Sequence, residues 1–191
     1  MKKGVSRLLV FVVLSWCFGL PAVASETGYT LNPGDVVVIS VWKEEGLDRE
    51  VLVLPDGTIT FPLAGTIQAS GLTANELQGE IVKRIKAYIA DPVVTVSVKA
   101  ILGNKFFVVG QVNNPGEFVV GHYTSVMQLL AMAGGLTPYA SEDDILIIRH
   151  QNDKAESLPF QYSDVARGKA LETDLILKPG DVVVVPTKGL F

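Results

Sequence analysis

The sequence predicts an α+β protein in which two small modules follow an N-terminal leader. Three observations point to this class. One nine-residue pattern occurs near each end, as LNPGDVVVI from Leu31 and as LKPGDVVVV from Leu177. Short β-branched runs separated by turns containing Gly and Pro fill most of the interval, with two helical segments among them. No alternation of strand and helix is long enough for a doubly wound parallel sheet.

Residues 1–24 form the expected leader. Three basic residues precede a 13-residue apolar stretch at 8–20, and Pro21 is followed by Ala-Val-Ala. Thirteen residues are too few for a membrane-spanning helix, which needs about twenty. A basic start, a short apolar stretch and small residues at the end are typical of a secretory signal peptide. We therefore expect cleavage between Ala24 and Ser25 and export of a soluble protein, with a retained signal as the alternative.

The charge and the cysteine content of the chain argue against several classes of function. The chain has 16 basic and 20 acidic residues, and loss of the leader removes Lys2, Lys3 and Arg7. The remaining 13 basic and 20 acidic residues disfavour nucleic acid as a partner, because phosphate binding needs a basic surface. The one cysteine, Cys17, lies in the leader, so no disulfide or thiolate site is expected. Lipidation of Cys17 is an alternative, although Trp16 before it departs from the lipoprotein pattern.

The two nine-residue patterns, which we call the cassettes (31–39 and 177–185), are expected to be turn-plus-strand units. Proline fixes φ and glycine accepts a positive φ, as the two central positions of a type II turn require. A β-branched run follows each turn and predicts a strand. Two copies 146 residues apart do not make a solenoid. The predicted turn residues are Pro33, Gly34, Asp35, Pro179, Gly180 and Asp181.

The first module, residues 25–103, is predicted as a β-β-β-α-β unit. Asp56 and Gly57 after a proline predict a hairpin turn in a small antiparallel sheet. Thr73 and Glu76 form a capping box that starts a helix. Strands are expected at 51–54, 58–61, 66–69 and 93–98. The apolar face of the helix is expected to carry Leu77, Ile81, Ile85, Tyr88 and Ile89.

The second module, residues 104–191, is predicted as strand, hairpin, helix and strand, which is the order that a β-grasp-like fold needs. Its helix is expected to begin at Thr124 or Ser125 and to end at Gly134 and Gly135. Residues 150–156 are expected to form a loop or hairpin tip, and the second cassette supplies the last strand. The other strands are expected at 106–109, 118–120 and 145–148, with a turn at Asn114, Pro115 and Gly116.

Residues suited to catalysis are few. The two histidines, His122 and His150, are expected at the surface, and no metalloprotease, nucleotide-binding or serine-hydrolase motif occurs. Acidic clusters lie at 44–45 and 142–144, and the second is interpreted as a solvated loop with calcium binding as an alternative. Trp42 is interpreted as a core anchor rather than a sugar-stacking platform. We therefore predict no catalytic residue, cofactor or metal site, and a protein that is not an enzyme.

A family resemblance is carried by five segments, which follow one another as LNPGDVVVISVWKEEGL, LPDGTITFPLAGTIQASGLT, YIADPVVTVSV, FFVVGQVNNPGEFVV and LLAMAGGLT. In order and spacing they resemble the Wza-type outer-membrane polysaccharide export (OPX) family over nearly all of residues 29–186. By this resemblance, residues 51–100 look like the polysaccharide export domain and residues 105–150 like the soluble-ligand-binding β-grasp (SLBB) domain. In the family the strand at 35–42 can join the sheet of the second module.

The resemblance implies a conduit for a capsular or extracellular polysaccharide (exopolysaccharide), built as a homo-oligomeric ring around a periplasmic passage. An inner-membrane polysaccharide co-polymerase is the implied partner. The sequence differs from long family members in two respects: it lacks the lipidation cysteine, and it stops soon after the second cassette. We therefore expect a periplasmic protein that is associated with the outer membrane through partners, above all a separate outer-membrane β-barrel.

Two hypotheses from other classes remain. One is a monomeric periplasmic module that binds glycan through the β-grasp domain, and its oligomeric state would distinguish it from a ring. The other is a glycan-cleaving enzyme that uses carboxylates, for which Glu44, Glu45 and Asp56 are the residues to substitute.

Overall fold

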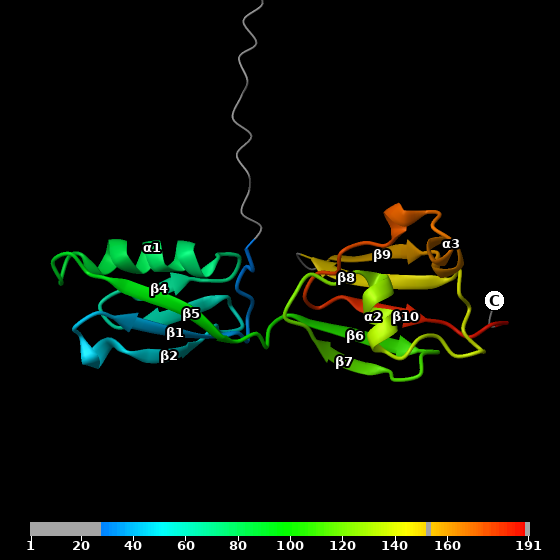
Figure 1. Cartoon of the computed structure of the whole chain (residues 1–191), viewed down its shortest axis with the longest axis horizontal. Coiled ribbons are helices and arrows are strands. Elements are labelled where there is room, and N and C mark those ends of the chain that lie inside the picture. The colour runs from blue at the N-terminus through cyan, green and yellow to red at the C-terminus, as the bar shows by residue number, and fades with distance from the viewer. Residues whose placement is uncertain (1–27, 152–153, 190–191) are drawn as a thin grey trace, which may run out of the picture.

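The computed structural model describes residues 28–151 and 154–189. Two domains lie end to end and are joined by a short linker at 101–104 (Figure 1). The expected leader, with Cys17 and the predicted cleavage site between Ala24 and Ser25, lies outside the described residues. The predicted α+β class is confirmed, since the described residues form ten strands in three sheets together with three α-helices.

The first domain arranges a three-stranded sheet, a hairpin and a helix around one core. The sheet has the order β2–β1–β5 and is antiparallel throughout. In β1, alternate side chains (Val37, Ile39 and Val41) are buried, as the two-residue period of a strand requires. The elements are β1 Val36–Val41, η1 Glu45–Leu47, β2 Arg49–Leu52, β3 Thr58–Phe61, β4 Gly65–Gln68, α1 Ala74–Ile85 and β5 Val94–Ala100.

The pairing of β1 corrects two expectations. Because β1 pairs with β2 and β5, the topology in which residues 35–42 join the second sheet does not occur here. The strand expected at 51–54 lies at 49–52 and pairs with β1, whereas β3 pairs with β4. The turn at 55–57 is closed as predicted, since the Gly57 N–H donates to the Leu54 carbonyl (2.8 Å) and the Leu54 N–H donates to the Thr58 carbonyl (2.8 Å), but the strands on its two sides belong to different sheets. A turn is specified locally, but the partner of the preceding strand depends on the hydrophobic faces of the whole domain.

Helix α1 begins at the predicted capping box. The Thr73 hydroxyl accepts a hydrogen bond from the Glu76 N–H (3.3 Å), and the Glu76 carboxylate accepts one from the Thr73 N–H (2.7 Å). The helix ends at Ile85, and the side chain of Tyr88 is 68 % exposed, so Tyr88 does not belong to the apolar face as predicted. The buried side chains of the helix are Leu77, Ile81 and Ile85.

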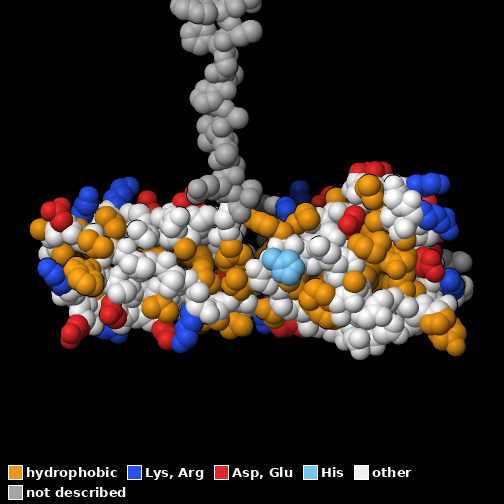
Figure 2. All heavy atoms as spheres, in the orientation of Figure 1, with side chains coloured by type: hydrophobic (Ala, Val, Ile, Leu, Met, Phe, Trp, Pro, Cys, Tyr) orange, Lys and Arg blue, Asp and Glu red, His pale blue; other side chains and the backbone are white. Residues whose placement is uncertain are grey.

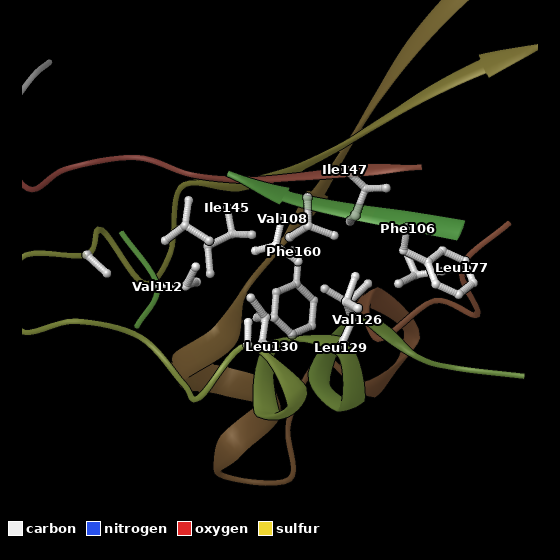
Figure 3. Close-up of a cluster of buried hydrophobic side chains, with 14 of the residues drawn as sticks. Phe106, Val108, Val112, Val126, Leu129, Leu130, Ile145, Ile147, Phe160 and Leu177 are labelled. Carbon is white, nitrogen blue, oxygen red and sulfur yellow. The ribbon is translucent and has the colours of Figure 1, made fainter. Parts of the chain in front are cut away.

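The second domain is a five-stranded sheet with helices on one face. The strand order is β7–β6–β10–β8–β9, in which β10 and β6 are parallel and the other pairs antiparallel. Figure 3 shows Phe160 between Val108 of the sheet and Leu129 and Leu130 of α2, at the centre of the core. The elements are β6 Lys105–Gly110, β7 Gly116–Val119, α2 Val126–Met132, β8 Ile145–Gln151, β9 Lys154–Phe160, α3 Tyr162–Ala166, η2 Leu171–Thr173 and β10 Val182–Val185.

Three local features of this domain differ from prediction or refine it. The stretch expected as a loop or hairpin tip at 150–156 lies at the end of the antiparallel β8–β9 pair, as the hairpin alternative predicted, and the two strands extend into it up to the pair of Gln151 and Lys154. Gly116 is the first residue of β7 instead of the centre of a turn, because the preceding loop is bound to the end of α2 by the Asn114 N–H, which donates to the Ala133 carbonyl (2.8 Å). Ser125, not Thr124, is the N-cap of α2.

Candidate functional site

The two cassettes meet at the linker between the domains, and each begins with the same turn. Gly34 and Gly180 have φ angles of +99° and +89°, which glycine adopts without strain. In each turn the aspartate N–H donates to the carbonyl three residues earlier, at 3.0 Å in both. We call this region, residues 32–35, 102–105 and 178–181, the interdomain joint.

The buried Asp35 carboxylate binds the linker to the first domain. Its Oδ1 accepts hydrogen bonds from the N–H groups of Leu102 (3.0 Å) and Gly103 (2.8 Å). Its Oδ2 accepts from the Asn32 N–H (2.8 Å) and the Tyr29 hydroxyl (2.6 Å). Burial, and then the hydrogen bond to Asp35, raise the pKa of Tyr29 above its ordinary range. The Tyr29 hydroxyl therefore keeps its proton and remains a donor to this carboxylate.

Close packing adds to these hydrogen bonds. A Cβ atom on Gly103 would lie 2.4 Å from the Pro33 carbonyl oxygen, a distance at which one of them must move. Glycine at 103 therefore allows the linker to lie directly against the first turn.

The second cassette holds the strand that follows the linker. The Gly180 N–H donates to the Lys105 carbonyl (2.8 Å), and the Phe107 N–H donates to the Asp181 carbonyl (3.0 Å). The buried Asp181 carboxylate accepts two hydrogen bonds from the Arg149 guanidinium, at 2.9 and 2.6 Å. The hydrogen bonding with Asp181 raises the pKa of Arg149, so this ion pair stays charged. The two cassettes thus hold the two ends of the linker.

A cavity of about 270 Å³ opens beside the joint. Figure 2 shows the surface hollowed where the two domains meet, with a histidine beside the hollow. Residues of both domains line the cavity, among them Tyr29, Asn32, Asn104, His122, Tyr123 and Pro179. Aromatic rings, amides and an imidazole therefore surround it, and no Asp, Glu, Lys or Arg is among the described residues that line it.

The face of the five-stranded sheet that points away from α2 is apolar. Successive side chains of a strand point to opposite faces of the sheet. Those that point towards α2, such as Val108 and Ile147, belong to the core. The strand register places the residues of this face in two rows of three, of which Val109 and Leu146 are 44 % and 39 % exposed and the other four are half-buried. A solvent-facing sheet surface usually carries polar residues, so this one is typical of an interface. We call it the outer sheet face, which consists of Phe107, Val109, Leu146, Ile148, Val182 and Val184.

Known families match both domains. Residues 23–99 match the family described as polysaccharide biosynthesis/export protein, and residues 105–159 match the SLBB domain. Together these matches cover well over half of the chain. The chain belongs to the Wza-type polysaccharide export family.

Relatives of this export-family chain include the EPS I polysaccharide export outer membrane protein EpsA of Ralstonia solanacearum, which is 25 % identical over 87 % of the chain. The polysialic acid transport protein KpsD of Escherichia coli is 27 % identical over 74 % of the chain. The matched part is 55 % of EpsA and 25 % of KpsD, so the chain spans about half of the first relative and a quarter of the second. The names of these relatives describe export and transport and not catalysis, in line with the prediction that the protein is not an enzyme.

The predicted turn residues of the polysaccharide export and SLBB domains lie in separate places. Residues 33–35 and 179–181 come together at the joint. Asp56 and Gly57 lie in an exposed turn, where hydrogen bonds from the Thr58 N–H and hydroxyl lower the pKa of Asp56. Gly134 and Gly135 end α2 with φ angles of +79° and +81°, beside the loop that precedes Pro115 and Gly116.

Several residues of the cavity were missed by the sequence analysis. Tyr29, Asn104 and Tyr123 are separated by long stretches of chain and share no motif. The repeated cassette was the available signal, because Asn32 and Pro179 occur within its two copies. It predicted two identical turns but not that they lie next to each other.

Trp42, His122 and His150 are all exposed, which contradicts the prediction for Trp42 and agrees with the prediction for the histidines. The side chain of Trp42 is 70 % exposed, so the interpretation as a core anchor is wrong. Trp42 directly follows β1, and Val41 is the last residue of that strand whose side chain is buried. His122 and His150 are both exposed as expected, but the structure places His122 alone at the cavity.

Two further observations concern the described part of the chain as a whole. Within residues 28–151 and 154–189, no group of three or more His, Cys, Asp and Glu side chains is arranged to hold a metal ion. None of the helices in these ranges has the length and apolar character needed to cross a membrane.

Proposed function

We propose that this protein is a periplasmic component of a machine that exports a capsular or extracellular polysaccharide, in which it acts as a conduit. The observation that carries this proposal is the succession of a polysaccharide export domain and an SLBB domain in one chain. Relatives that share most of this chain are named as polysaccharide export and transport proteins. The polysaccharide itself, an inner-membrane co-polymerase and a separate outer-membrane channel are the proposed partners.

The outer sheet face supports a second part of the proposal, which is that identical subunits form a ring. Its two apolar rows lie on the side of the sheet opposite α2, where within the described residues Val109 and Leu146 are exposed and the other four are half-buried. The Lys105–Glu117 ion pair (2.9 Å) lies at the edge of this face and gives it a polar rim. An apolar centre with a polar rim is typical of protein interfaces. We expect the face to bind a different surface of the next copy, because head-to-tail contacts form a ring when the rotation between neighbouring copies closes.

The mass of the purified, exported protein tests this assembly. Light scattering after gel filtration is expected to give a mass several times that of one chain. Val184 pairs with Val109 and Leu146 in the centre of the outer sheet face, so Val184→Lys should reduce the mass towards that of a monomer. Val93→Lys is the matched control, because Val93 is 61 % exposed and lies in the first domain, far from this face along the chain.

Circular dichroism of both variants must match that of the parent protein, so that a lower mass reports lost contacts and not unfolding. Leu146→Lys, at an already exposed position, serves as a second variant if Val184→Lys does not fold. A parent protein that is monomeric at all concentrations tested would contradict the ring and favour the monomeric glycan-binding module.

A further inference from the structure

The cavity beside the interdomain joint combines aromatic rings with fixed hydrogen-bond acceptors. Asn104 is buried, and its amide nitrogen donates to the carbonyls of Val120 and His122. Asn32 likewise uses its amide nitrogen within the protein, donating to the Tyr29 hydroxyl (3.0 Å) and the Thr30 carbonyl (3.0 Å). Among the described residues, neither asparagine carbonyl oxygen has a hydrogen-bond donor, and neither is sealed from solvent. Two acceptors of fixed orientation therefore belong to residues that line the cavity.

The aromatic part of the lining lies on both sides of the domain boundary. Tyr29 belongs to the first domain, and Tyr123 and the exposed imidazole of His122 belong to the second. Tyr29 is immobilised by its hydrogen bonds with Asp35 and Asn32, whereas the side chain of Tyr123 is 58 % exposed. A flat ligand with C–H groups on its face and hydroxyls at its edge matches this combination of rings and acceptors.

We propose that this cavity binds one uncharged sugar residue of a glycan. The identity of that glycan as the exported polymer rests on the function proposed above. Sugar hydroxyls donate to the carbonyl oxygens of Asn32 and Asn104, and the ring packs against Tyr123. A volume of about 270 Å³ is small for a ligand site and suits one sugar ring rather than an oligosaccharide.

The described residues that line the cavity include no Asp, Glu, Lys or Arg, and this composition favours neutral sugars. A uronic or sialic acid would bring a carboxylate against these described residues, which offer it no Lys or Arg, and a desolvated charge without a partner is costly. The Asp35 carboxylate accepts four hydrogen bonds from the protein. It is therefore already satisfied and does not serve as an acceptor for the ligand.

A single sugar ring is expected to bind weakly, with a dissociation constant of about 1 mM, because it offers few atoms for contact. Weak binding also fits a moving polymer, since a tight site would hold it. Because both domains contribute residues, an occupied cavity favours the arrangement of the domains seen here.

The two histidines of the chain allow a direct test by NMR. His122 lines the cavity and His150 does not, so the second imidazole is an internal control. The exported full-length protein is titrated with methyl glucoside, methyl galactoside and methyl N-acetylglucosaminide, and separately with glucuronate. We expect the His122 ring resonances to shift and saturate in the millimolar range with at least one neutral glycoside, while those of His150 stay in place.

Two tyrosine variants show where binding occurs. Tyr123→Ala should weaken binding of the neutral glycoside at least about tenfold. Tyr139→Ala should leave binding unchanged, because Tyr139 is similarly exposed (69 %) but does not line the cavity. The proposal is overturned if no neutral glycoside shifts His122, if both tyrosine variants bind alike, or if glucuronate binds as well as the neutral sugars.

These outcomes are independent of the proposed export function, which is tested by polysaccharide release from cells. A protein that supports release but binds no glycoside would leave the export function standing and refute the sugar site. A protein that binds glycosides at His122 but is dispensable for release would support the sugar site and refute the export function.

Discussion

Substitution of Asp35 by asparagine tests whether the interdomain joint is held as described. Asparagine has nearly the same shape as aspartate but carries an NH₂ group in place of one carboxylate oxygen. The two oxygens of Asp35 each accept two hydrogen bonds, three of the four from backbone N–H groups. In either orientation of the new amide, its NH₂ group therefore faces at least one backbone N–H that has lost its acceptor.

The expected loss of stability follows from these contacts. A buried donor left without an acceptor costs about 1–3 kcal/mol, and each remaining bond to a neutral acceptor is weaker by about 1 kcal/mol than one to a carboxylate. We therefore expect Asp35→Asn to lower the free energy of unfolding by about 3 kcal/mol, since it creates at least one such donor and weakens the other contacts. The loss should be concentrated where the carboxylate contacts the linker, at Leu102 and Gly103.

Urea unfolding and amide hydrogen exchange measure the two parts of this prediction. The midpoint of unfolding should fall, and the amides of Leu102 and Gly103 should exchange much faster in the variant. Asp56→Asn is the matched control, because one exposed oxygen of Asp56 accepts both of its hydrogen bonds and an amide oxygen can replace it. Equal stability of the two variants, or unchanged exchange at the linker, would refute the role given to Asp35.

Three further predictions concern ionisable groups. Arg149→Met leaves the Asp181 carboxylate buried without its cation, and thermal unfolding should show a loss of about 3–5 kcal/mol. The double variant Arg149→Met/Asp181→Leu should restore only part of this loss, because it removes the buried charge but leaves the Lys178 N–H without its acceptor. An unaffected single variant would contradict the buried ion pair. Because the pKa of Tyr29 is raised in the folded protein, the unfolded chain loses this proton first, so stability should fall as pH rises above about 10 and should fall less in Tyr29→Phe. Identical alkaline profiles would speak against the hydrogen bond between Tyr29 and Asp35. Hydrogen bonds from the Thr73 N–H and hydroxyl lower the pKa of Glu76 below its ordinary 4.5, so the capping box should contribute stability above that pH and lose it as pH falls. Acid unfolding followed by circular dichroism should therefore be less steep in Glu76→Gln, and an unchanged slope would contradict this assignment.

Features set by a few neighbouring residues could be predicted from the sequence. The capping box of α1 and the turns depend on side chains within three residues of each other, and glycines at 34 and 180 have the positive φ angles that their turns need. The order of strands and helices was also largely accessible, because hydrophobic periodicity is a local property. Helix α3 was missed, since five residues are too few to show a period.

Features that depend on contacts between distant segments could not be predicted. The choice of β2 and β5 as partners of β1, and the contact of Asp35 with residues 67 and 68 positions later, leave no local pattern. The cavity was missed for the same reason, because its residues come together only when both cassettes lie against the linker. Trp42 was wrongly expected in the core, because residue type alone predicts burial only on average and its side chain is exposed.

The location of the polysaccharide in cells tests the proposed function most directly. In a strain that lacks the gene, polysaccharide in the medium and on the cell surface should fall sharply and polymer should accumulate in the periplasm. The unaltered protein and Val93→Lys should restore release, whereas Val184→Lys in the outer sheet face should not. Unchanged release of polysaccharide from the deletion strain would contradict a role in export.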